Sequence, residues 1–180
     1  MIKKIAIATF ALAAGIASAA DFVSVDVDHV KASNGAASQA QYVRAGKEIG
    51  GIQYGLQSRT SVANEGGMFN SLELTAGKAI GGLTPFVGVG HDNGLNGAVK
   101  AGYTYGLVGA TAGAQVGPGF ALLGVKTRAL STEEVRTKQT VAFTTYSVPL
   151  TKTVAANINL SKSYQDIKED AWGFGLTVKF

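Results

Sequence analysis

The sequence predicts an all-β fold, a transmembrane antiparallel up-and-down β-barrel of ten strands. Three observations predict it: segments in which apolar and polar residues alternate, glycine-rich turns that recur at a regular spacing, and an export signal at the start of the chain. Eight strands with longer loops is the alternative, because the sixth and eighth predicted strands alternate poorly.

The clearest alternation lies in the last predicted strand. Five large apolar residues there are spaced by two, which places them on one face of an extended strand: Trp172, Phe174, Leu176, Val178 and Phe180. Glycine, threonine and lysine occupy the other face. We expect the apolar face to meet lipid and the small, polar face to line a barrel interior.

The end of this strand resembles the closing strand of Gram-negative outer-membrane β-barrels. That class has a terminal signature of glycine, two residues, an apolar residue, one residue and an aromatic residue, which Gly175, Val178 and Phe180 match. The resemblance implies that these three residues act as an insertion signal for the outer-membrane assembly machinery. It also implies the cell outer membrane as location, with outer-membrane lipid and lipopolysaccharide as surroundings.

Residues 1–20 are predicted to be a secretory signal peptide. Lys3 and Lys4 precede an apolar run over 5–16, and small residues follow, so that cleavage is expected after Ala19 or Ala20. The run is shorter than the roughly 20 residues that a transmembrane helix needs. The barrel is therefore expected to occupy residues 21–180 as one domain.

The turns divide the barrel into strands. The segment 45–52 recurs as 76–83 and more loosely as 112–120, and a fourth turn is expected at 148–152. An even number of strands places both ends on one side, which in the resembled class is the periplasm. Five polar segments suit the opposite rim: 31–38, 62–67, 93–97, 131–137 and 165–169. The predicted strands are 22–30, 39–48, 52–61, 68–78, 83–92, 98–111, 120–130, 138–148, 153–164 and 170–180.

Composition removes several classes of partner. Without Lys3 and Lys4, 14 basic residues face 12 acidic ones, so the exported chain is nearly neutral and no nucleic acid is expected as a partner. The chain has no cysteine, and it shows neither a metal-ligand cluster nor a phosphate-binding loop. We therefore expect no metal and no cofactor, and a monomer.

Charges on the predicted inner faces are the candidate functional residues. A network in the lumen is predicted from Asp26, Arg44, Arg59, Glu73, Lys126 and Arg128. Asp26 is expected opposite Arg44, and Arg59 opposite Glu73, as cross-strand pairs. Such pairs lock a narrow barrel, or they line a water path whose selectivity is set by unpaired Lys126 and Arg128. Ten strands lie nearer the size at which side chains fill the interior, so a structural role and a narrow passive channel both stay open.

Two further classes of function remain as alternatives. An interaction protein would present the outer loops, which are only about five to eight residues long. An outer-membrane hydrolase would use His29 or His91, each of which adjoins an aspartate. Adjacent residues on a strand point to opposite faces, so neither pair forms an inward dyad and no enzyme is expected.

Aromatic residues are expected to form girdles at the two membrane interfaces. The predicted girdle residues are Phe69, Tyr103, Tyr164 and Trp172 near one rim, and Phe22, Phe120, Tyr146 and Phe180 near the other.

Overall fold

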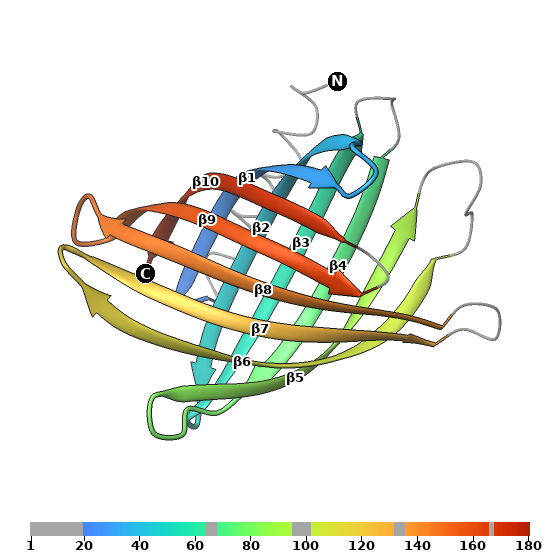
Figure 1. The fold of residues 1–180 in the computed structure, drawn as a ribbon. Helices are drawn as coiled ribbons and strands as arrows, with labels where there is room; N and C mark the ends of the chain where they lie inside the picture. Colours follow the sequence, from blue (N-terminus) through green and yellow to red (C-terminus); the bar gives the residue numbers. More distant parts are fainter. Residues whose placement is uncertain (1–19, 64–67, 95–101, 132–135, 166–167) are drawn as a thin grey trace.

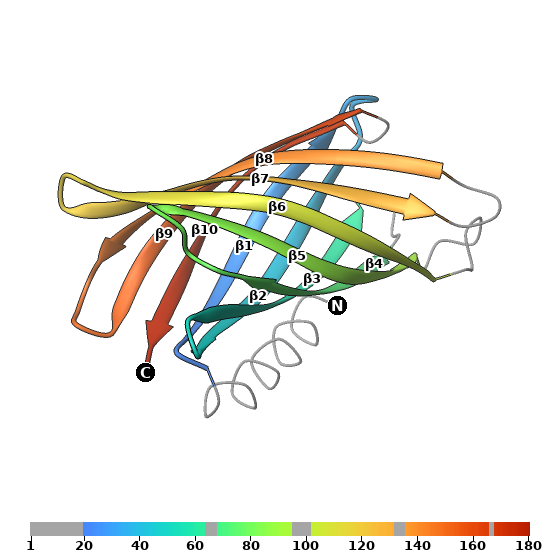
Figure 2. The same ribbon diagram turned by 90° about the horizontal axis from the view of Figure 1, so that it is seen from below.

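The computed structural model describes residues 20–63, 68–94, 102–131, 136–165 and 168–180, and they form a closed antiparallel barrel of ten strands. Each strand pairs with its neighbours in the chain, and β1 pairs with β10. Figures 1 and 2 show the strands following one another around the barrel. The predicted ten-strand fold is confirmed. The predicted signal peptide falls almost entirely on residues 1–19, which lie outside the described residues.

The strands lie close to their predicted positions, except β6, which begins and ends five residues later than the predicted 98–111. Their bounds are β1 Phe22–Ala32, β2 Ala37–Ile49, β3 Ile52–Ala63, β4 Met68–Gly77, β5 Leu83–Gly94, β6 Tyr103–Val116, β7 Gly119–Ser131, β8 Arg136–Pro149, β9 Val154–Gln165 and β10 Glu169–Lys179.

The start of β1 and the end of β10 lie at the same rim of the barrel. The ladder between β1 and β10 begins with Phe22 opposite Lys179, and the backbone N–H of Phe180 donates to the carbonyl oxygen of Asp21 at 3.1 Å. We call this end the turn rim, because the tight turns after β2, β4, β6 and β8 also lie there, and the opposite end the loop rim.

Glycines with positive φ angles lie in the turns after β2, β4 and β6 at the turn rim. Gly50 and Gly51 join β2 to β3, and both have positive φ angles, of 60° and 77°, as a two-residue hairpin of this type requires. The third turn lies at Gly117, later than expected, so β6 runs to Val116 instead of ending at residue 111. Gly113 was predicted to belong to this turn, but it lies inside β6, where the ring of Phe120 covers it.

The barrel is apolar outside and polar inside. Large apolar side chains on the outer surface are widely exposed, such as Leu123 at 61% and Phe174 at 58%, whereas Asp26 and Glu73 are only 1% and 3% exposed. A soluble barrel has the reverse arrangement, and a continuous apolar exterior of this kind faces lipid. No helix among the described residues is long and apolar enough to cross a membrane.

Aromatic rings inside the barrel lie over glycines of neighbouring strands. A Cβ atom added at Gly90 would lie 2.3 Å from the ring of Tyr105, and one at Gly124 would lie 2.2 Å from the ring of Phe143. The same relationship joins Phe22 to Gly46, Phe86 to Gly109, and Phe120 to Gly113. These inward rings explain why the sixth and eighth predicted strands alternate poorly.

The predicted aromatic girdles are therefore only partly right. The registers place Tyr146, Tyr164 and Trp172 on the outer face. They place Phe22, Phe69, Tyr103 and Phe120 on the inner face, so these four belong to the filling of the barrel and not to its lipid interface.

Candidate functional site

The polar chain across the lumen

A buried carboxylate in β1 is surrounded by hydrogen-bond donors. The side-chain amides of Asn159 and Asn157 donate to Oδ1 of Asp26 at 2.8 and 3.3 Å. Oδ2 accepts from the Ser24 hydroxyl at 3.1 Å and forms an ion pair with Arg44. Burial of a charge is tolerated only when it is paired and hydrogen-bonded, and Asp26 meets both conditions.

The expected pair of Asp26 and Arg44 is thus present, although the two residues are not directly opposite. The register places Ser24 opposite Arg44 and Tyr42 opposite Asp26. The long arginine side chain reaches the diagonal position, which stays on the same face because it is two residues away.

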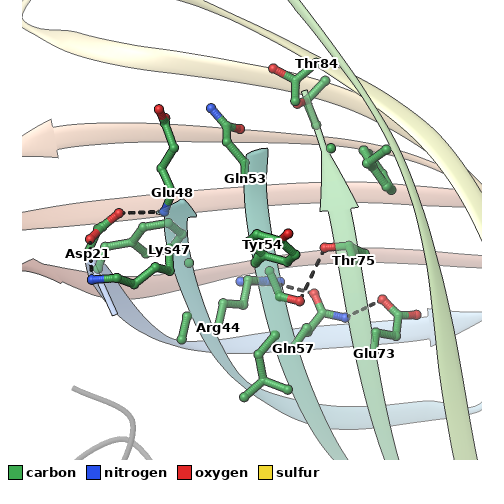
Figure 3. A pocket seen from close by; sticks show the side chains of 18 of the residues that line it. Asp21, Arg44, Lys47, Glu48, Gln53, Tyr54, Gln57, Glu73, Thr75 and Thr84 are labelled. Carbon is green, nitrogen blue, oxygen red and sulfur yellow. Dashed lines mark hydrogen bonds and ion pairs between the residues drawn. The ribbon is translucent and has the colours of Figure 1, made fainter. Parts of the chain in front are cut away.

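Gln57 extends this cluster to β4. Its amide oxygen accepts from Nε of Arg44 at 3.0 Å, and its amide nitrogen donates to Oε2 of Glu73 at 3.2 Å. Figure 3 shows the three side chains in this order along β2, β3 and β4. The amide therefore connects the two buried carboxylate clusters.

Glu73 is the second centre. Its carboxylate accepts from Lys126 Nζ at 2.6 Å, from Arg128 Nη2 at 2.5 Å and from the Tyr105 hydroxyl at 2.9 Å. Lys126 and Arg128 lie on β7, which is not adjacent to β4, so these ion pairs cross the lumen. The prediction that Lys126 and Arg128 are unpaired is wrong.

Arg59 lies apart from this cluster. It forms an ion pair with Glu169 at 3.7 Å, and its guanidinium carbon is 5.8 Å from the ring centre of Tyr42. The predicted pair of Arg59 and Glu73 is wrong: Ser71 stands opposite Arg59, and the carboxylate of Glu73 is paired with Lys126 and Arg128 instead.

The hydrogen bonds form one continuous chain across the barrel, which we call the polar chain. From Glu73 it continues through Arg128 to Gln139 of β8, where Nη1 donates to the amide oxygen at 2.6 Å. Its members are Asn157, Asn159, Asp26, Arg44, Gln57, Glu73, Lys126, Arg128 and Gln139. Gln57, Asn157 and Asn159 have the inward position along their strands that the alternation predicts, but the contacts across the lumen carry no signal in the sequence.

Cavities, histidines and the terminal signature

Cavities lie on both sides of the polar chain. Two open toward the turn rim, with volumes of about 480 and 440 Å³, and both are lined by Phe22, Arg44 and Leu122. A smaller cavity of about 160 Å³ lies toward the loop rim, between Asp28, Arg59 and Arg128. Arg44 and Leu122 line all three, so these two side chains lie between the two ends of the lumen.

A charged pair marks the mouth of the 480 Å³ cavity. The Asp21 carboxylate accepts from the backbone N–H of Glu48 at 2.8 Å and from Lys47 Nζ at 3.2 Å. Both contacts are drawn in Figure 3. They lower the pKa of Asp21, the backbone hydrogen bond more than the lysine.

The histidines lie on the outer face. His91 contacts the Thr104 hydroxyl at 3.0 Å and Asn93 at 3.1 Å, and the ring of His29 lies 5.8 Å from that of Trp172. Asp28 and Asp92, next to them in the chain, are buried on the inner face. The prediction that neither pair forms an inward dyad is confirmed. No group of three or more potential metal ligands occurs in the part of the chain that the structure describes.

The residues of the terminal signature have different surroundings. Gly175 faces the lumen beside Asp26, where an added Cβ atom would lie 2.0 Å from Oδ1 of that carboxylate. Val178 and Phe180 are exposed, Phe180 to 66%. Gly175 thus has a packing reason to be glycine, while the insertion role of all three residues stays a prediction.

The chain matches no protein-family model, and no curated protein matches it in sequence. Among solved structures it is similar to neisserial surface protein A, with 15% identity, a TM-score of 0.47, and coverage of 88% of this chain and 96% of that one. The translocator domain of the autotransporter NalP from Neisseria meningitidis has 10% identity and a TM-score of 0.46, covering 97% and 96%. The N-terminal barrel domain of OprF from Pseudomonas aeruginosa has 12% identity and a TM-score of 0.38, covering 89% and 98%.

Identities and TM-scores of this size carry no argument about function. The fold rests instead on the ladder of ten strands and on the distribution of apolar residues. Both lead to one conclusion: the chain is a ten-stranded transmembrane β-barrel.

Proposed function

We propose that this protein is an integral outer-membrane β-barrel with a structural role, and that its lumen is closed. The observation that carries the proposal is the polar chain, which crosses the lumen from β9 through β1 to β4 and on to β7 and β8. The predicted signal peptide and the terminal residues Gly175, Val178 and Phe180 support export and insertion by the outer-membrane assembly machinery. Lipid and lipopolysaccharide of that membrane are the proposed surroundings of a monomer.

The energy of the buried ion pairs supports a closed resting state. Removing one partner of a buried pair costs about 3–5 kcal/mol, because the other charge is left uncompensated. Glu73 has two such partners and Asp26 has one. A passage that required these pairs to separate would therefore open rarely.

A narrow passive channel is the second candidate. It is favoured by the cavities on both sides of the polar chain, which share Arg44 and Leu122 in their linings. Movement of these shared side chains would connect the cavities. The three lumen cations Arg44, Lys126 and Arg128 share the two carboxylates of Asp26 and Glu73, which leaves a net charge of only +1, so such a channel would be only weakly selective for ion charge.

Single-molecule conductance in planar lipid bilayers tests the two candidates. The variant Asp26→Ala/Arg44→Ala removes both members of an ion pair, and so leaves no unpaired charge while it breaks the polar chain. We expect no conductance steps from the inserted wild-type protein and discrete steps from the double variant. Arg59→Ala is the control, because its partner Glu169 lies outside the polar chain, and it should be silent. Discrete steps from the wild type would overturn the closed barrel in favour of the channel.

A further inference from the structure

Three charged residues form a row on the outer face near the loop rim. The registers place Lys31 of β1 opposite Asp170 of β10, and Asp170 opposite Lys162 of β9. All three side chains are exposed, and Lys162 Nζ lies 3.4 Å from Oδ1 of Asp170. Neighbouring strands are separated by about 4.8 Å, so the two lysines stand roughly 10 Å apart, with the aspartate between them.

The outer face is different from β2 to β7. Toward the loop rim, the outward positions of β2 to β7 that the structure describes carry no lysine, arginine or carboxylate; among them are Gln41, Thr60, Asn70, His91, Thr104 and Thr127. The outward lysines of the loop rim are therefore gathered in the sector from β8 to β1, where Lys138 of β8 is also exposed.

Below the charged row, the outer face becomes aromatic and then aliphatic. Toward the turn rim, the next outward row is His29, Trp172 and Leu160. The row after that is Val27, Phe174 and Ile158, and the ring of Trp172 lies 5.7 Å from that of Phe174. Charge, then aromatic rings, then aliphatic side chains is the order found across the boundary of a bilayer. The row of lysines is thus level with the lipid head groups.

We propose that Lys31 and Lys162 bind the anionic, phosphate-bearing head group of a lipid in the leaflet at the loop rim. Each ammonium has three donors, and phosphate oxygens are strong acceptors. Two lysines and one aspartate leave the row with a net positive charge, while the apolar rows below it accommodate the acyl chains. Asp170 competes with the lipid for Lys162. The inference rests on the proposed membrane placement, under which this lipid is lipopolysaccharide.

The protein carries its own reporter for this contact. Trp172 is the only tryptophan, and it lies on the outer face of β10, two residues from Asp170. Lipids with brominated acyl chains quench tryptophan fluorescence on contact. Quenching of Trp172 therefore measures which lipid occupies this sector.

The experiment compares brominated phosphatidylglycerol with brominated phosphatidylcholine at equal fractions in vesicles. We expect phosphatidylglycerol to be favoured at Trp172 by about fivefold per lysine, the effect of one cation at an anionic surface. Lys31→Gln/Lys162→Gln should abolish the preference, and Asp170→Asn should increase it. Unlabelled lipid A should compete with the brominated phosphatidylglycerol. The control Lys78→Gln/Lys152→Gln, at the turn rim, should change nothing.

Equal quenching by the two lipids in the wild type would overturn the proposal, as would a preference that survives in the Lys31→Gln/Lys162→Gln variant. The same vesicles, heated and unheated, are compared on a detergent gel. Absence of a heat-dependent shift would refute the membrane barrel itself, whereas a normal shift with equal quenching would refute the lipid site alone.

Discussion

Arg128 of β7 and Glu73 of β4 form an ion pair at 2.5 Å across the lumen, between strands that share no backbone ladder. The backbone hydrogen bonds hold each strand only to its two neighbours. This contact, with that of Lys126, ties together two strands that lie three positions apart around the barrel. It makes the interior a source of stability that the ladder alone does not supply.

Replacing Glu73 by glutamine should destabilise the barrel strongly. The variant keeps the shape of the side chain but leaves Lys126 and Arg128 buried without a counter-charge, a loss of about 3–5 kcal/mol. The measurement is the free energy of unfolding by urea in lipid vesicles. Glu48→Gln, an exposed carboxylate at the turn rim, is the control and should stay within about 0.5 kcal/mol of the wild type. Equal stability of the two variants would contradict the role of Glu73 as a buried centre.

The contact between an aromatic ring and a glycine gives a second prediction. Gly90→Ala places a methyl group against the ring of Tyr105, and overpacking of this kind costs about 1–3 kcal/mol. Gly106→Ala is the matched control, because a Cβ atom there meets nothing within 4 Å. Urea unfolding should show a loss for the first variant and no loss for the second. If neither variant changed the free energy of unfolding, the packing of the Tyr105 ring would not require glycine at residue 90.

The outer face of β7 gives a third prediction, about depth in the membrane. Leu123 lies within its apolar stretch, and Thr127 lies nearer the loop rim. Arginine on the lipid face costs about 2–4 kcal/mol at the middle of a bilayer and about 0–1 kcal/mol near its interface. Leu123→Arg should therefore lower the free energy of unfolding in vesicles far more than Thr127→Arg. Similar losses for both would mean that the apolar stretch does not mark the membrane interior.

A variant at Phe180 distinguishes a role in membrane insertion from a role in the stability of the folded barrel. Its side chain is exposed and follows the last residue of β10, so Phe180→Ala should hardly change the unfolding midpoint of the refolded barrel. If the terminal signature is read during insertion, the same variant should reduce the heat-shifted fraction in cell membranes. Val116→Ala, an exposed apolar residue at the same rim, should leave that fraction unchanged. A normal inserted fraction for Phe180→Ala would remove Phe180 from the insertion signal.

More of the fold than of the candidate site could be predicted from the sequence. Alternation and glycine turns located all ten strands, because the side-chain period of a strand and the conformational demands of a turn are local properties. The centre of each of the first two loop-rim hairpins lies one residue earlier than expected, which moves each cross-strand partner by two. That shift keeps every residue on its predicted face, but it replaced Glu73 with Ser71 opposite Arg59.

The ion pairs across the lumen could not be predicted from alternation and turns. Whether Lys126 meets Glu73 depends on the curvature of the closed barrel, which no local pattern records. The inward rings of Phe86, Tyr105 and Phe143 were missed for a related reason. An apolar residue on a strand is assigned to the lipid face unless the glycine that its ring covers on the next strand is recognised.

The ladder between β1 and β10 has a kinetic consequence. Every other pair of strands forms a local hairpin, but this seam joins Phe22 to Lys179 and Ala32 to Glu169, from opposite ends of the described chain. Closing so long a loop has a large entropic cost, and non-local pairing slows folding. We therefore expect the hairpins to form early and the seam last. Until it closes, the unpaired edges of β1 and β10 are open to pairing with a second chain.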